Sequence, residues 1–403
     1  MSAIDAATAG WPPVAYEELA WESQYPPGVA SRTQIRKHQG PYQAAIPAAI
    51  ARVSLALPAE ALSISTEAAS EVARFDAEMG GEIAPFSAVL LRSESSASSQ
   101  IENLTASARA IAEAEIGEGS RSNARQVVGN VAAMNAALAL SKNLTASAIL
   151  DMHDALLHDV EPDIAGKWRK APVWVGGSSL GPHTALFVPP KYGRVPGLID
   201  DLVSFIDRDD VPVLAHAALA HAQFETIHPF PNGNGRTGRA LMHAMLRGKG
   251  LTRNVTVPIS AGLLVDVDTY FDALSAYRDG DPEPIVRQVA EASYAAVTNG
   301  RQLVADLRAV RQEWQSRVRV RRDATAWRVA DLLLRHPVIN AGLVSDELGI
   351  AAPNVYRTIE PLVTAEVLTS SGRQRDRVWH AREVLLAVDA FAARAGRRSR
   401  VRQ

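Results

Sequence analysis

Twelve consecutive residues, His228 to Arg239 (HPFPNGNGRTGR), combine the residue types needed to bind an anion and to move a proton. Gly233 and Gly235 form a loop that can turn tightly and leave its N–H groups free, and a helix resumes near Arg236. Exposed N–H groups and the positive end of the dipole make such a helix start an anion site. Arg236 and Arg239 share the first turn, and two arginines with bare amides suit a polyphosphate better than a single carboxylate. His228 directly precedes the loop, where a neutral imidazole can take a proton from a hydroxyl.

Each of these features taken alone is common. A single histidine before a proline is usually structural, and two arginines at i and i+3 usually form a solvated helix face. Here all of them occur within twelve residues, so the combination favours a functional loop over a structural turn. The sequence therefore predicts a polyphosphate site with a proton acceptor beside it.

The twelve residues resemble the signature of Fic-domain proteins of the Fic/Doc superfamily, HPFx(D/E)GNGRxxR, at every fixed position but one. The resemblance implies nucleotidyl transfer, most often of AMP from ATP to a Ser, Thr or Tyr hydroxyl of a target protein. It makes His228 the base that deprotonates this hydroxyl and Phe230 the anchor of the loop. It also assigns the β-phosphate side to Arg236 and the γ-phosphate to Arg239, which places the α-phosphate in line for attack. The nucleotide-binding residues that it implies are Phe230, Asn232, Gly233, Asn234, Gly235, Arg236 and Arg239.

Asn232 is the position at which the loop departs from the signature. Family members usually carry Asp or Glu there, which helps to hold the Mg²⁺ that bridges the phosphates. Because asparagine offers one neutral carbonyl oxygen, we expect Asn232 to be a weak metal ligand and the phosphates to supply more of the coordination. The resemblance thus implies ATP and Mg²⁺, while the asparagine leaves UMP or another phosphoryl group open as the group transferred.

Two short β runs, 171–175 and 185–188, flank the Gly/Ser turn GGSSLG and predict a β-hairpin. Together with Gly166-Lys167-Trp168-Arg169 and the following Pro189-Pro190, this stretch is similar to the flap of Fic proteins. The resemblance implies that an extended target segment pairs with the edge of the hairpin, which places its hydroxyl near His228. The expected docking residues are Val173, Trp174, Val175, Leu186 and Phe187.

Tyr270 and Tyr277 lie on one face of the helix expected after residue 266. They are candidates for the nucleoside pocket, Tyr270 in particular. Packing of both rings in an aromatic core explains their spacing equally well.

Upstream of the loop, Ser98-Ser99-Gln100-Ile101-Glu102-Asn103 resembles the inhibitory motif of the family, (S/T)xxxE(G/N). Ser98, Glu102 and Asn103 occupy its fixed positions. A glutamate on a helix beside the anion loop would pair with Arg239 and would repel the γ-phosphate, so ATP could not adopt its productive pose. The same glutamate could position a water that hydrolyses an AMP–protein bond. On its own, Glu102 would be taken for a surface residue.

Apolar residues at three- and four-residue spacing predict a mainly α-helical chain, with early helices over 41–78, 84–116 and 121–142. We expect a Fic-type helical core with a small hairpin flap, followed by a winged helix-turn-helix domain. The predicted domains are an N-terminal helical region (1–83), the Fic core with an inhibitory helix near 94–105 (84–300), a connector helix (301–322) and the winged helix-turn-helix domain (323–403).

The C-terminal segment has the element order of a winged helix, with helices over 323–335, 340–349 and 352–363 and then a two-stranded wing. In the third helix, Val355, Ile359 and Leu362 share the inward face. Pro361 should kink or end this helix. The arginines that could contact DNA phosphates are Arg373, Arg375 and Arg377 in the wing and Arg397, Arg398, Arg400 and Arg402 in the tail. Docking of a protein or dimerisation is the competing interpretation.

The amino-acid composition excludes several classes of functional site. The 403 residues include no cysteine, which excludes disulfides, thiolate metal sites and a cysteine nucleophile. The net charge of −2 is the sum of unlike parts: residues 315–403 hold 16 Arg, no Lys and 9 acidic residues, a net +7, which leaves −9 for residues 1–314. No run of 18 apolar residues and no basic leader occurs, so we expect a cytoplasmic protein without a membrane segment.

The sequence thus predicts an autoinhibited protein adenylyltransferase, with auto-AMPylation among its reactions. One alternative is a deAMPylase, or a transferase of another nucleotide, on the same fold. Another is a DNA-binding regulator whose Fic core senses nucleotide. The expected partners are ATP and a target protein, and the sequence leaves duplex DNA and a second copy of the chain open.

Overall fold

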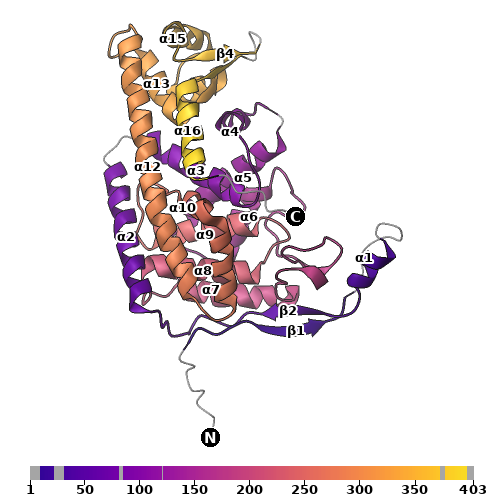
Figure 1. Ribbon diagram of the computed structural model, residues 1–403. Coiled ribbons are helices and arrows are strands. Elements are labelled where there is room, and N and C mark those ends of the chain that lie inside the picture. Colours follow the sequence, from indigo (N-terminus) through magenta and orange to yellow (C-terminus); the bar gives the residue numbers. More distant parts are fainter. Residues whose placement is uncertain (1–9, 22–30, 81–84, 120, 373–376, 397–403) are drawn as a thin grey trace. The chain divides into compact units, whose positions relative to one another are not determined.

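The computed structural model describes residues 10–21, 31–80, 85–119, 121–372 and 377–396 (Figure 1). The described chain is mainly helical, as predicted, and carries two small antiparallel sheets. It packs into two compact units. Unit 1 consists of Met1–Thr66, Ala136–Lys249 and Asp268–Val289, and unit 2 of Glu67–Asn135, Gly250–Val267 and Ala290–Gln403. Both units are thus assembled from segments far apart in the sequence, and the predicted domain boundaries stay a prediction.

Unit 1 contains the predicted functional loop. Its elements are β1 (Ala15–Leu19), α1 (Arg32–Lys37), β2 (Tyr42–Ile46), α6 (Ala146–Leu157), α7 (Val195–Ile206), α8 (Val213–Ile227), α9 (Asn234–Gly248) and most of α11 (Val267–Arg278). Helix α8 is its centre, since every residue from Leu214 to Ile227 is buried. At Gly238 the next helix, α9, approaches α8 so closely that a Cβ there would lie 2.8 Å from the Phe224 ring. This close packing fixes the helices on either side of the loop.

Unit 2 holds the predicted inhibitory segment and the C-terminal segment. Its elements are α3 (Pro85–Ile101), α4 (Ala108–Glu115), α10 (Ile259–Leu263), η3 (Leu264–Asp266), α13 (Thr325–Arg335), β3 (Val338–Asn340), α14 (Ala341–Leu348), α15 (Ala352–Thr364), β4 (Thr369–Ser371), β5 (Val378–His380) and α16 (Arg382–Arg394). The helices α2 (Ala59–Gly80), α5 (Ser122–Leu140) and α12 (Glu283–Arg317) include residues of both units.

The N-terminal segment corrects one expectation. Residues 42–46, expected to start a helix, form strand β2, which pairs with β1 from Ala15↔Ile46 to Leu19↔Tyr42. The buried side chains of Tyr42 and Ala44 alternate with the exposed Gln43. This period of two belongs to a strand rather than a helix. The helical part begins only at Ala59.

The helix expected over 84–116 is in fact two helices, α3 and α4. Asn103, between them, has a φ of 61°, a left-handed conformation that asparagine tolerates better than most residues. Ser107 caps the second helix by accepting a hydrogen bond from the Ala110 N–H. The chain therefore turns directly after Glu102.

The C-terminal elements occur in the predicted order, and β3, β5 and β4 form one three-stranded sheet. Val355, Ile359 and Leu362 are buried, as expected. Helix α15, however, continues past Pro361 to Thr364, so the proline does not end it. Of the arginines predicted to contact DNA, only Arg377 lies within the described residues. The winged-helix assignment stays a prediction.

Within the described ranges, no helix is both long enough and apolar enough to cross a membrane.

Candidate functional site

His228 terminates helix α8 in a left-handed backbone conformation. Its φ and ψ are 49° and 62°, and its N–H still donates to the Phe224 carbonyl at 2.9 Å. Pro229 disfavours the helical region for the preceding residue, so the helix must end here. A left-handed non-glycine residue costs roughly 1–2 kcal/mol. The His228 side chain is 20% exposed, with Nδ1 3.8 Å from the Glu225 carboxylate. The imidazole therefore reaches the surface from a constrained backbone.

The loop after His228 is closed by a single side chain. The Asn234 amide accepts a hydrogen bond from the Phe230 N–H and donates one to the Phe230 carbonyl, both at 2.8 Å. Asn234 therefore contributes its side chain to the shape of the loop, and its predicted contact with the nucleotide stays a prediction. Helix α9 starts at this residue, and Gly233 before it has a φ of 79°. No side chain caps this helix start, as an anion-binding N-terminus requires.

Arg236 and Arg239 lie on the first turn of α9. Each side chain is only 1% exposed. Cations so far from water need anionic or strongly dipolar surroundings. Two of them on one turn, at the positive end of a helix, make this the most electropositive part of the described loop.

Phe230 holds the loop in the core, as predicted. Its ring is stacked on His153, with centroids 3.6 Å apart, and on Trp168, with centroids 5.0 Å apart. His153 Nδ1 accepts a hydrogen bond from the Gly166 N–H, so the proton of the neutral ring is on Nε2, which donates to the Asn232 carbonyl at 3.0 Å. Burial lowers the pKa of His153 to about 4. A neutral imidazole of one tautomer thus fixes the tip of the loop.

Comparison with known proteins supports the resemblance of the His228–Arg239 loop to the Fic signature. Residues 143–246, which include the whole loop, match the Fic/DOC family. This segment therefore resembles a Fic domain. The chain is 33% identical over 175 residues to a protein adenylyltransferase Fic from Aedes aegypti and 30% identical over 161 residues to one from Drosophila erecta. These alignments cover 41% and 39% of this chain but only 32% and 30% of the relatives.

A solved structure also resembles this chain. A Fic family protein from Desulfovibrio desulfuricans G20 superposes with a TM-score of 0.52 over 81% of this chain and 97% of its own, at 20% sequence identity. At this identity the similarity is one of fold.

At Asn232, where the loop departs from the signature, the structure places nearby a residue that the sequence analysis missed. The Glu161 carboxylate accepts a hydrogen bond from Asn232 Nδ2 at 2.6 Å. Since a carboxylate only accepts, the amide nitrogen must face Glu161, and the amide oxygen accepts from the Gly233 N–H at 2.7 Å. A carboxylate therefore does lie beside position 232, but it comes from the segment that follows α6.

The predicted flap hairpin is reduced to one antiparallel bridge between Val175 and Phe187. Gly176 and Gly177 have φ values of 71° and 73°, and Pro182–Thr184 forms a short 3₁₀ turn, so the chain bulges instead of continuing as strands. Val188 accepts a hydrogen bond from the Ala45 N–H of β2 at 3.0 Å. The flap is thus attached to the N-terminal sheet.

Side chains of the predicted docking residues alternate across the flap. Leu186 is 88% exposed, whereas Phe187 is 6% exposed and lies under the Arg278 guanidinium, 3.9 Å from its ring centroid. Val173, Trp174 and Val175 are partly buried, and the Trp174 indole donates to the Ser178 carbonyl at 2.9 Å. Of these five side chains, only that of Leu186 is largely exposed to solvent and so accessible to a partner.

Tyr270 and Tyr277 lie in the core of unit 1. The Tyr270 hydroxyl lies 2.7 Å from Nε2 of His221, whose pKa is lowered to about 3 by burial. Tyr277 donates to the Gln223 side chain at 2.9 Å and packs on Trp11. Their exposed fractions are 1% and 2%, in agreement with the core-packing alternative. A nucleoside contact of Tyr270 stays a prediction.

The predicted inhibitory segment is firmly held within unit 2. The Glu94 carboxylate of α3 accepts hydrogen bonds from the backbone N–H, at 2.8 Å, and the hydroxyl of Ser260. Asn130 of α5 donates to the Ser95 carbonyl at 2.8 Å. Ser98 is buried, whereas Glu102 and Asn103, just beyond the end of α3, are exposed. The pairing of Glu102 with Arg239 stays a prediction.

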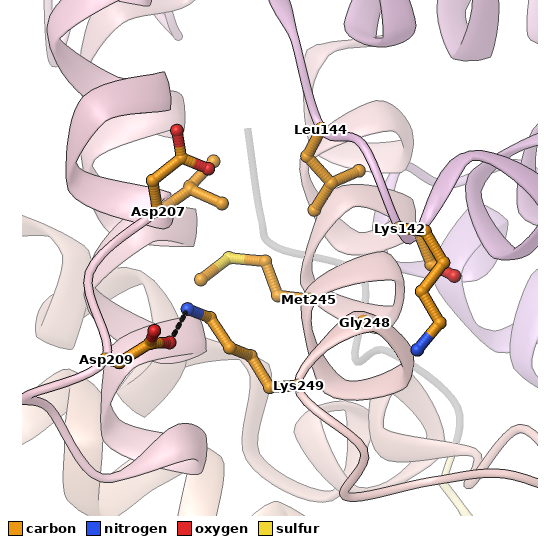
Figure 2. Close-up of a pocket in the computed structure, with 9 residues that line it drawn as sticks. Lys142, Leu144, Asp207, Asp209, Met245, Gly248 and Lys249 are labelled. Carbon is orange, nitrogen blue, oxygen red and sulfur yellow. Dashed lines mark hydrogen bonds and ion pairs between the residues drawn. The ribbon is translucent and has the colours of Figure 1, made fainter.

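A pocket of about 230 Å³ lies elsewhere in unit 1, at the C-terminal ends of α7 and α9 (Figure 2). Lys249 points across it and forms an ion pair with Asp209 at 2.7 Å. No residue from His228 to Arg239 lines this pocket. We therefore assign it no part in the predicted chemistry.

Proposed function

We propose that the Fic domain transfers AMP from ATP to a Ser, Thr or Tyr hydroxyl of a target protein. One observation carries the proposal. A partly exposed imidazole ends α8, and the short loop after it leads to an uncapped helix start whose first turn bears two buried arginines. The relatives named protein adenylyltransferase Fic support the same chemistry.

In the proposed reaction, His228 takes the proton of the target hydroxyl. The hydroxyl oxygen attacks the α-phosphorus, the bond from this phosphorus to the oxygen bridging it to the β-phosphate breaks, and pyrophosphate leaves. The amides at the start of α9 and Arg236 bind the α- and β-phosphates, and Arg239 holds the γ-phosphate so that the leaving group lies opposite the attacking oxygen. The protein forms no covalent intermediate.

We also propose that Glu161 provides the negative charge that the signature places at residue 232. Glu161 and Asn232 present a carboxylate and a carbonyl oxygen, the hard ligands that Mg²⁺ prefers. These are two donors of the kind that Mg²⁺ prefers, and the phosphates would supply the rest of the coordination. When bound, the ion would neutralise charge that develops on the phosphates in the transition state. Glu161 and Asn232 would hold it at the tip of the loop.

Autoinhibition by Ser98, Glu102 and Asn103 is a further part of the proposal. Glu102 is exposed where the chain turns after α3, and the rest of that helix is hydrogen-bonded within its own unit. A carboxylate presented from a rigid helix could occupy Arg239 and exclude the γ-phosphate. Replacement of Glu102 by glycine would then release the activity.

We also propose that the C-terminal segment has a second, separate role in binding a partner. Asn354, Tyr356 and Arg357 project from the exposed face of α15, opposite its buried side. A winged helix uses this face to contact DNA or protein. Affinity for duplex DNA that falls steeply with salt would favour the DNA-binding alternative.

The transferred group can be tested directly. Glu102→Gly protein is incubated with Mg²⁺ and each α-labelled nucleoside triphosphate in turn, and label on protein is counted. We expect labelling with ATP and an AMP adduct by mass spectrometry. Label from UTP in preference to ATP would replace the adenylyl assignment, and label from no nucleotide would refute nucleotidyl transfer.

A further inference from the structure

Arg169 is a buried arginine that binds only backbone. Its side chain is 3% exposed, and every hydrogen bond that its guanidinium makes within the described chain goes to a carbonyl oxygen. Nε donates to His228 at 2.8 Å, and the terminal nitrogens donate to Ile227 at 3.5 Å, Pro190 and Ala171. The Arg169 backbone N–H donates to the Pro229 carbonyl at 3.0 Å.

Such an arrangement is costly and calls for a reason. Burial lowers the pKa of Arg169 to about 10, so the group is still charged at neutral pH. A charge removed from water without a carboxylate partner is unfavourable. The Ile227 and His228 carbonyls, however, are among the last of α8, at the negative end of the helix dipole and without intrahelical donors. The Arg169 guanidinium donates the hydrogen bonds that these two carbonyls would otherwise lack.

The residues next to Arg169 support the same loop. The Gly166 N–H sets the tautomer of His153, which holds Asn232. Trp168 stacks on Phe230. Trp168 and Arg169 thus contact the loop at its anchor and its histidine, and Gly166 supports its tip indirectly through His153. The sequence analysis linked this stretch only to the start of the flap. In the structure it also stabilises the His228–Arg239 loop.

We propose that Arg169 is a positioning residue that holds His228 in its left-handed conformation and so aims the imidazole. The Nε–H···O bond fixes the orientation of the peptide that follows His228, which determines where the side chain projects. Through the Pro190 carbonyl, the same guanidinium ties the end of the flap to the histidine. The placement of a docked hydroxyl and of its base would thus depend on one side chain.

The test uses the full chain carrying Glu102→Gly, with Arg169→Lys or Arg169→Ala added. Lysine keeps the charge, but its single ammonium group cannot donate to several carbonyls in the fixed directions of a planar guanidinium. Transfer of AMP to the protein is measured as kcat and KM for ATP. We expect kcat to fall by about 10- to 100-fold in both variants, with KM changing by no more than about twofold, since a misplacement of about 1 Å reduces the rate by this much.

Guanidinium added at millimolar concentration should partly restore the kcat of Arg169→Ala. Lys170→Ala, an exposed neighbour outside residues 166–169, is the matched control and should behave like the parent.

A second readout does not need activity. In protein labelled with ¹³C-histidine, the Cα and Cβ shifts of His228 report its backbone conformation. They should leave the left-handed range in Arg169→Ala and return with guanidinium. Unchanged shifts, an unchanged kcat or an effect confined to KM would overturn the inference, as would loss of cooperative folding in both variants. The activity arm rests on the proposed function: if the parent transfers nothing, that function fails, and the shifts still decide the role of Arg169.

Discussion

The loop from His228 to Arg239 and the C-terminal segment from Thr325 to Arg394 are stabilised in different ways. In the loop, individual side-chain hydrogen bonds hold the backbone, such as those of Asn234 to Phe230. In the C-terminal segment, an apolar stripe of α15 (Val355, Ile359 and Leu362) packs inward, and its other face is exposed. A stripe of this kind tolerates swaps of similar volume, whereas a network of single hydrogen bonds tolerates almost none. The loop should therefore be the more sensitive to mutation.

The largest loss of stability is expected from Phe230→Ala. It removes a fully buried ring from between His153 and Trp168, and such truncations cost about 3–5 kcal/mol. Urea unfolding monitored by circular dichroism gives the free energy of unfolding. A loss below about 1 kcal/mol would show that the loop does not depend on this anchor.

Asn234→Ala should cost about 3 kcal/mol, because the N–H and the carbonyl of buried Phe230 both lose their partner. Asn234→Asp is the matched variant. Its carboxylate can still accept from the N–H but cannot donate to the carbonyl, so we expect a smaller loss. Equal losses in the same urea experiment would mean that the two hydrogen bonds are not separately important.

The pH dependence of stability should report His153. Its pKa in the folded protein, about 4, lies below the ordinary value of 6.5, so the unfolded chain takes up the proton first as the pH falls. The stabilisation is complete above about pH 6.5 and is lost as the pH falls toward 4, by about 2 kcal/mol between pH 7 and pH 5. His153→Gln should flatten this part of the stability curve. An unchanged slope would show that His153 does not stay neutral in the fold.

A charge swap at the tip of the loop tests the proposed role of Glu161. Binding of Mn²⁺, used in place of Mg²⁺, is followed by its electron paramagnetic resonance signal in the presence of ADP. Glu161→Gln should weaken binding by about tenfold. Adding Asn232→Asp should restore it, because one carboxylate and one amide are again present. Asn232→Asp alone sets two carboxylates against each other and should destabilise the fold. Wild-type affinity in Glu161→Gln would rule out Glu161 as a metal ligand.

The smallest effect is expected in the other region. Leu386 of α16 is 56% exposed, so Leu386→Ala should change the free energy of unfolding by less than about 0.5 kcal/mol. A larger loss would mean that this surface is covered in solution, which would point to a partner or a second copy.

The loop was predictable from the sequence because its chemistry lies within twelve consecutive residues. Its supports were not. Glu161 and His153 stand 71 and 79 residues before Asn232, and no spacing rule connects them to it. The best available signal was the stretch from Gly166 to Arg169, which we noticed but linked only to the flap. Histidine and arginine that bind backbone carbonyls leave no periodic pattern in a sequence.

Secondary structure was predictable where periodic patterns are long. Helices such as α9 and α13 were anticipated, and the C-terminal elements occur in the predicted order. The five-residue strands β1 and β2 were missed, since so short an alternation is easily mistaken for part of a helical pattern. In the flap, the antiparallel pairing is limited to Val175 and Phe187, because two consecutive glycines with positive φ divert the chain after Val175.

The central claim is that His228 acts as the base of an adenylyl transfer that Glu102 restrains. The most direct measurement is the incorporation of label from α-labelled ATP into protein by the wild type, Glu102→Gly and Glu102→Gly combined with His228→Ala. We predict a strong rise for Glu102→Gly and a fall of at least about 100-fold on adding His228→Ala, with ATP binding retained. Undiminished labelling in the double variant, or no labelling in Glu102→Gly with any nucleotide, would contradict the account.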